Sequence, residues 1–161
     1  MTNRDRPSMP QGYGIAKAEA GGMLDWPAVE AKLTESRNYW IATTGPDGRP
    51  HATPVWGLWL DGAFFFSTDP TSLKGRNIAR NPAIVVHLES GDDAVILEGA
   101  AERITDTAVL ARFADAYDVK YSFRPDTNDP DFGFYTLRHK VAMAWLEADF
   151  PNTATRWRFN S

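Results

Sequence analysis

The feature that most constrains this chain is a run of three β-branched and aromatic segments separated by two turn sequences. The first segment, 39–44, is followed by Gly45–Gly48, a sequence made of turn-forming residues. The second, about 49–60, is followed by Asp61-Gly62, a strong signal for a two-residue hairpin, and then by the third, 63–68. The pattern predicts three contiguous antiparallel strands.

The remaining periodic segments add further strands and three helices to this framework. The helices are expected at about 26–37, 70–80 and 107–119, and the strands at about 83–89, 94–104, 132–137, 140–147 and 155–159. A small closed or partly closed barrel hides this many strand edges with little exposed backbone. The sequence therefore predicts a mainly β domain with flanking helices.

The length of 161 residues is that of a single domain. Residues 1–22 show no periodicity and are rich in glycine, alanine and proline, so we expect a flexible N-terminal arm before one domain at 23–161. The N-terminus has no apolar signal core, and no stretch reaches the ~20 apolar residues that a membrane-spanning helix requires. We therefore expect a cytoplasmic protein.

Composition and missing motifs exclude several classes of function. The 17 basic and 21 acidic residues give a net charge of -4, which provides no basic face for duplex nucleic acid. The absence of cysteine excludes disulfides, thiol nucleophiles and thiolate metal sites, so any redox chemistry requires a cofactor. No Ser-His-Asp set, HExxH, P-loop or GxGxxG motif can be assembled, which leaves hydrolysis and nucleotide triphosphate chemistry without support.

The segment Thr68–Asn77 combines several hydroxyls with a lysine at the start of a predicted helix. Free backbone N–H groups, the Ser72 hydroxyl and the Lys74 ammonium form a set that suits a phosphate monoester. The alternative is an ordinary surface helix with Asp69 as its N-cap and with Lys74 and Arg76 in water.

Two strands carry patterns that allow two interpretations. Pro54 lies in the middle of the second predicted strand, which suits an edge strand whose free backbone groups meet a ligand, or one that meets none. In the last strand, Arg156 and Arg158 alternate with aromatic residues. These arginines lie either over an anion or on a solvated face.

Taken together, these motifs resemble the flavin and deazaflavin split-barrel oxidoreductases, the superfamily named after pyridoxamine 5'-phosphate oxidase. The resemblance rests on Ile41–Thr44, Asp47–Pro50, Pro54–Trp56, Phe66–Thr68, Ser72–Lys74, Asn77, Asn81-Pro82 and Glu98-Gly99. It implies a split β-barrel that forms a homodimer, with the cofactor at the subunit interface. The cofactor-binding positions implied are His51, Thr53, Val55, Trp56, Ser67, Thr68, Ser72, Lys74 and Asn77.

The function implied is an oxidoreductase that uses F420 or FMN to transfer a hydride to or from a small, planar, unsaturated substrate. No catalytic side chain and no metal are expected, because the cofactor carries the chemistry. The chain departs from the oxidase at Thr53 and Leu73, where the oxidase has arginines, and at Ala94, where it has a glutamine. Oxidation of vitamin B6 phosphates is therefore not expected, and the likeness is closer to a branch that uses F420, in which other members bind FMN, FAD or haem.

Two other functions remain open. A non-catalytic carrier or sensor that binds a flavin or haem would have the same sequence features, and a nucleic-acid-binding barrel is disfavoured by the acidic balance. The long irregular stretch Ser122–Asp131 either walls the ring end of the cofactor pocket, without holding the phosphate, or is a plain surface loop.

Overall fold

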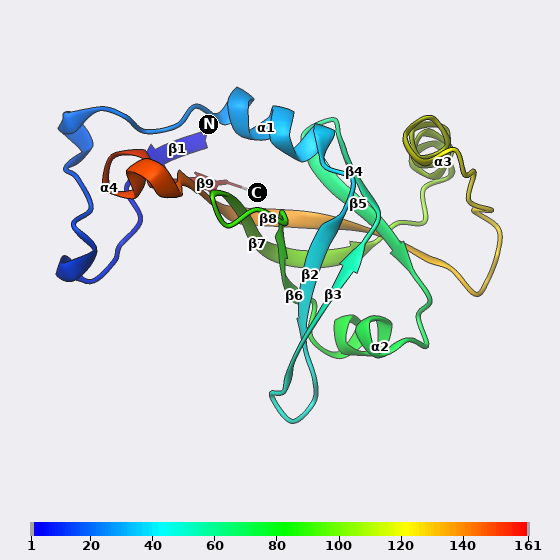
Figure 1. Cartoon of the computed structure of the whole chain (residues 1–161). Helices are drawn as coiled ribbons and strands as arrows, with labels where there is room; N and C mark the ends of the chain where they lie inside the picture. Colours follow the sequence, from blue (N-terminus) through cyan, green and yellow to red (C-terminus); the bar gives the residue numbers. More distant parts are fainter. Residues whose placement is uncertain (1, 161) are drawn as a thin grey trace.

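A sheet of nine antiparallel strands organises the computed structural model, which describes residues 2–160 (Figure 1). The strands are β1 (Thr2–Asp5), β2 (Tyr39–Thr44), β3 (Pro50–Val55), β4 (Gly57–Leu60), β5 (Ala63–Thr68), β6 (Ala83–His87), β7 (Asp93–Arg103), β8 (Gly133–Leu146) and β9 (Thr155–Phe159). The α-helices are α1 (Trp26–Glu35), α2 (Leu73–Arg80), α3 (Thr107–Tyr121) and α4 (Phe150–Thr153), and the short 3-10 turns are Gln11–Tyr13, Ala18–Ala20 and Glu147–Asp149. The predicted mainly β class is confirmed.

The long strand β8 connects the two parts of the sheet. The main path runs β1-β9-β8-β7-β6-β2-β3, while β5 pairs with β4 on one side and with β8 on the other. Because β8 pairs with β7, β9 and β5, the sheet branches and curls instead of lying flat. This arrangement is that of a split barrel.

Two predictions were wrong about where strands begin and end. The predicted strand 49–60 is two strands, because β3 pairs with β2 and the chain then turns at Trp56 so that β4 pairs with β5. The predicted strands 132–137 and 140–147 are one strand, β8, which pairs with β7 from Tyr135 to Leu146, with a bulge at Lys140 opposite Glu98 and Gly99. The polar residues between them lie on the strand and do not interrupt it.

The N-terminal segment contains a strand that the sequence did not indicate. β1 pairs with β9, and the Asp5 carboxylate accepts hydrogen bonds of 2.8 Å from both Arg156 and Arg158. These ion pairs lower the pKa of Asp5 below its ordinary value. Both interpretations of the two arginines were incomplete, because the anion that they hold is a carboxylate of the chain itself.

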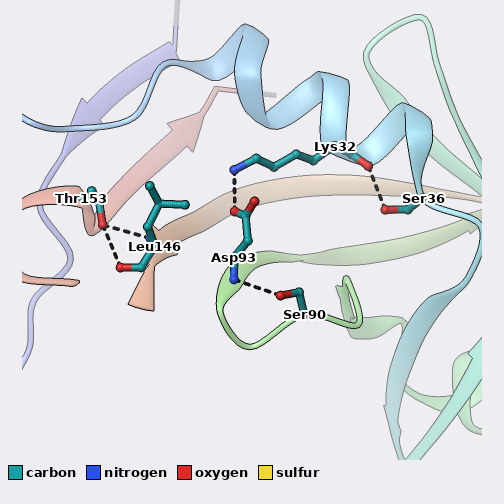
Figure 2. Close-up of polar contacts among 6 residues, drawn as sticks. All are labelled: Lys32, Ser36, Ser90, Asp93, Leu146 and Thr153. Atoms are coloured by element: carbon teal, nitrogen blue, oxygen red, sulfur yellow. Dashed lines mark hydrogen bonds and ion pairs between the residues drawn. The ribbon is translucent and has the colours of Figure 1, made fainter. Parts of the chain in front are cut away.

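Two hydrophobic clusters lie on the sheet. The larger contains Val29 and Leu33 of α1 packed on the sheet, and the smaller joins α3 to Leu58 and Phe134. Figure 2 shows how the C-terminal half of α1 is tied down: Lys32 pairs with Asp93 at the start of β7. Among residues 2–160, no helix has both the length and the apolar character needed to span a bilayer.

Candidate functional site

Strand β3 provides one wall of the candidate site. It is the last strand on the main path of the sheet and, within residues 2–160, pairs with β2 alone, so it is an edge strand there, one of the positions that the mid-strand proline suits. His51, Thr53 and Val55 lie on its half-buried face, while the residues between them are exposed. This face looks toward α2, the helix beside the β2–β3 hairpin in Figure 1.

The start of α2 is capped by Ser72 and not by Asp69, which corrects the alternative offered by the sequence. The Ser72 hydroxyl accepts a hydrogen bond of 3.0 Å from the Gly75 N–H. The Asp69 carboxylate instead accepts bonds of 2.7 Å from the N–H and the hydroxyl of Thr71, which lower its pKa. Its charge is therefore tied to Thr71 and does not cap the helix.

Lys74, in the first turn of α2, points back to β3. Its ammonium group donates a long hydrogen bond of 3.5 Å to the Thr53 hydroxyl, and no carboxylate lies within ion-pair distance among the described residues. The side chain is half-buried, and burial lowers the pKa of Lys74. An ammonium has three donors, so this lysine retains the capacity to bind an anion.

Two more of the predicted hydroxyls meet next to Lys74. The Thr68 hydroxyl, at the end of β5, lies 3.2 Å from the Ser72 hydroxyl. The start of α2 thus meets two strands through two separate pairs, Lys74 with Thr53 of β3 and Ser72 with Thr68 of β5. The Ser72 hydroxyl also donates a 2.7 Å hydrogen bond to the Asp69 carbonyl, so in this polar end Lys74 is the group that has donors left to bind phosphate without rearrangement.

Two predicted residues lie elsewhere. Asn77 is 2% exposed, and its amide donates a 3.0 Å hydrogen bond to the Thr43 hydroxyl, so it fastens α2 to β2. His51 and Asn77 border a separate hollow of about 340 Å³ beside the β2–β3 turn. Direct contact of either residue with a cofactor remains a prediction.

The other three predicted residues, Val55, Trp56 and Ser67, line an open hollow of about 480 Å³ together with Asn38, Pro54, Tyr117 and Phe132. Trp56 is 37% exposed and Phe132 is 44% exposed, which is unusual for such large aromatic side chains. Burial raises the pKa of Tyr117 to about 12, so its hydroxyl is neutral at physiological pH. This aromatic end of the site suits a planar ligand.

Sequence reasoning missed Asn38, Tyr117 and Phe132 as parts of this hollow. Tyr117 lies in the predicted helix 107–119 and also packs in the smaller hydrophobic cluster. An aromatic residue at helical spacing indicates core packing equally well, so the sequence held no separate signal for its second role.

A further hollow of about 330 Å³ lies between the end of α1 and the β6–β7 turn, the region drawn in Figure 2. Its lysine, Lys32, is already neutralised by Asp93, and none of the predicted cofactor-binding residues borders it. Within residues 2–160, no group of histidine and acidic side chains is arranged to hold a metal ion.

Comparison with known proteins agrees with this architecture. Residues 26–146 match the family model described as pyridoxamine 5'-phosphate oxidase. A pyridoxine/pyridoxamine 5'-phosphate oxidase of Cupriavidus metallidurans is 35% identical over 102 residues, which are 61% of this chain and 44% of the relative. The chain spans between 36% and 54% of the length of the curated relatives that it matches.

Three solved structures share the fold at 24% sequence identity. A conserved hypothetical protein of Mycobacterium tuberculosis aligns with a TM-score of 0.68 over 82% of this chain and 91% of its own. An F420 reductase aligns with a TM-score of 0.55 over 69% of this chain and 93% of its own. A heme binding protein of Mycobacterium smegmatis aligns with a TM-score of 0.59 over 75% of this chain and 54% of its own.

Proposed function

Because this chain belongs to the pyridoxamine 5'-phosphate oxidase family, whose members bind flavin, we propose that it binds FMN or the deazaflavin F420 between β3 and α2. The observation that carries the proposal is that Lys74, half-buried and without a carboxylate partner within residues 2–160, contacts Thr53 of β3, the strand that also borders the aromatic hollow. Thr53, beside the lysine, and Val55, in the hollow, are two residues apart, or about 7 Å along a strand. One ligand with a phosphate and a planar ring therefore reaches both.

Each end of the site has its own task in this proposal. Lys74 binds the phosphate of the cofactor with help from the Ser72 and Thr68 hydroxyls, while the backbone at Val55 and Trp56 lies along the ring. Bound there, either cofactor would supply a ring that accepts or donates a hydride. The chain itself orients the ring and excludes water from one side of it.

The proposed reaction is hydride transfer to or from a small, planar, unsaturated substrate. The aromatic walls of the hollow, among them Tyr117 and Phe132, favour a flat molecule beside the ring. Vitamin B6 phosphates do not fit the proposal, because Thr53 and Leu73 stand where the oxidase has arginines. The fold shared with an F420 reductase supports F420 as one of the two candidates.

We also propose that the protein is a homodimer. The face of the sheet opposite α1 and α2 carries partly exposed large side chains, namely Trp40, Val85, His87, Ile96, Met143 and Trp145. A contiguous apolar face of this kind is typical of a subunit interface. Light scattering across a dilution series should give twice the monomer mass, and a stable monomer at micromolar concentration would contradict the dimer.

Titration of the purified protein with FMN and with F420, followed by absorption spectroscopy, tests the central proposal. One of the two is expected to bind, with a shift of its visible absorption band. The reduced cofactor should then be reoxidised by an added unsaturated acceptor. Binding without turnover would instead favour a carrier or sensor, the function class suggested by the shared fold of the heme binding protein. Failure to bind either cofactor would overturn the proposal.

A further inference from the structure

The break between β3 and β4 is held by a hydroxyl from a distant helix. Tyr121, the last residue of α3, accepts a 3.0 Å hydrogen bond from the Gly57 N–H, and its oxygen lies 2.8 Å from the Gly57 carbonyl. The same oxygen lies 2.7 Å from the Arg37 carbonyl in the α1–β2 connection. A hydroxyl can accept one hydrogen bond and donate another, so this one group joins α3 both to the start of β4 and to the α1–β2 connection.

Lys120 adds a second set of bonds at the same place. Its ammonium group donates to the Tyr39 hydroxyl at 2.8 Å, to the Gly57 carbonyl at 3.2 Å and to the Thr34 carbonyl at 3.3 Å. All three of its protons are therefore used within the chain. Lys120 thus links α1, β2, β4 and α3 around the strand break.

Stacking fixes the exposed side chain that lies at the break. The Trp56 and Tyr121 rings are 4.6 Å apart and inclined by only 5°, and the Arg37 guanidinium lies 5.2 Å from the centre of the Trp56 ring. On its other side, the break is pressed against β5. A Cβ atom at Gly57 would lie 2.5 Å from the Phe64 ring and 2.9 Å from the Phe65 carbonyl oxygen.

We propose that Tyr121 and Lys120 are positioning residues that hold the β3–β4 break in the shape required by the ring end of the cofactor site. The inference rests on the proposed function, because Val55 and Trp56 form that end of the site. Neither Tyr121 nor Lys120 borders the hollow, so both act through the backbone at Gly57 and through the Trp56 ring. Loss of either group should leave the fold intact but loosen the ring site.

Tyr121→Phe provides the test, since it removes the hydroxyl and keeps the stacked ring. Tyr117→Phe is the matched control one turn earlier, because the Tyr117 hydroxyl has no hydrogen-bond partner within residues 2–160. In the protein without cofactor, Tyr121→Phe should accelerate amide hydrogen exchange at Gly57 by about tenfold, as loss of one hydrogen bond predicts. Tyr117→Phe should leave that rate within about twofold.

Three readouts separate positioning from general stability and from the proposed function. Amides of β7 and β8 should exchange at the wild-type rate in Tyr121→Phe, while FMN or F420 binds about tenfold more weakly and its absorption band shifts. Equal acceleration of all amides, an unchanged Gly57 rate or an unchanged affinity would overturn the positioning proposal. A wild-type protein that binds neither cofactor would overturn the proposed function and, with it, this inference.

Discussion

Two half-buried lysines stand at the two ends of the candidate site, and their hydrogen bonds differ. Burial lowers the pKa of both Lys74 and Lys120. Lys120 has three partners within 3.3 Å, whereas Lys74 has one, at 3.5 Å. Burying a charge costs free energy unless partners offset it, and within residues 2–160 Lys120 has more and shorter hydrogen bonds than Lys74. The comparison teaches that Lys120 belongs to the scaffold, while Lys74 has donors left for a ligand.

The two ends also differ in how the chain assembles them. The polar end comes mostly from one continuous segment, 68–74, with Thr53 opposite. The aromatic end gathers Asn38, the β3–β4 break, the end of α3 and Phe132, which are far apart in sequence. A change at one end should therefore leave the other largely intact, and this expectation can be tested end by end.

The largest effect is expected from Lys74→Ala. A hydrogen bond to a charged group contributes about 1.5–3 kcal/mol, so affinity for FMN or F420 should fall by about ten- to a hundredfold. Absorption titration measures the loss. The matched control is Arg80→Ala, which removes a cation at the far end of the same helix. Equal losses of affinity in the two variants would show that Lys74 does not bind the phosphate. The contrast between Lys74 and Lys120 would then be wrong.

The difference between the ends explains what the sequence could reveal. Thr68, Ser72 and Lys74 are close in sequence, so a strand end that runs into a helix start predicts them as neighbours, while their role in binding a cofactor rests on the family resemblance and stays a prediction. The roles of Tyr121 and Lys120 depend on where α3 meets β4, which no local pattern specifies. Strand pairing also explains why β3 and β4 were expected as one strand. The break at Trp56 exists because the two halves pair with different neighbours, and the local sequence does not reveal which strands pair.

Gly57→Ala tests how tightly the aromatic end is built. The new methyl group would overlap the Phe64 ring and the Phe65 carbonyl, and such overpacking costs about 1–3 kcal/mol. Urea unfolding should show a loss of this size. Gly91→Ala is the control, because a Cβ atom there meets nothing within 4 Å. If the two variants were equally stable, the strand break would be more pliable than the structure indicates.

A smaller effect should come from pH. Burial and the nearby Arg37 charge lower the pKa of Lys120 to about 8 from its ordinary value of 10.5. Between these two values the unfolded chain keeps a proton that the folded chain has lost, so the free energy of unfolding should rise with pH across this window. Lys120→Met should lack that contribution.

Urea midpoints at about pH 7 and about pH 9.5 measure this difference, and the upper limit avoids the tyrosines. Burial raises the pKa of Tyr39 and of Tyr121, and their contributions have the opposite sign above about pH 10. An identical pH dependence in the wild type and in Lys120→Met would show that Lys120 titrates normally, because its three hydrogen bonds then offset the effect of burial on its pKa.

The smallest effect on cofactor affinity is expected from shortening the loop between α3 and β8. Two of its three acidic side chains are already engaged: Asp126 accepts a 2.9 Å hydrogen bond from the Asn128 N–H, and Asp129 accepts one of 2.9 Å from the Asp131 N–H. None of residues 122–131 borders the aromatic hollow, although Phe132, which follows them, does. A loop with this charge and position is suited to meet a substrate and not a phosphate.

Replacing residues 124–130 by a short glycine-serine link should therefore change turnover or substrate preference, through the position of Phe132. Affinity for FMN or F420 should stay within about threefold, which corresponds to ~0.65 kcal/mol. Absorption titration and steady-state kinetics on the same preparation separate the two quantities. If the shortened protein lost the cofactor instead, the loop would belong to the cofactor site. The assignment of phosphate binding to Ser72 and Lys74 alone would then be incomplete.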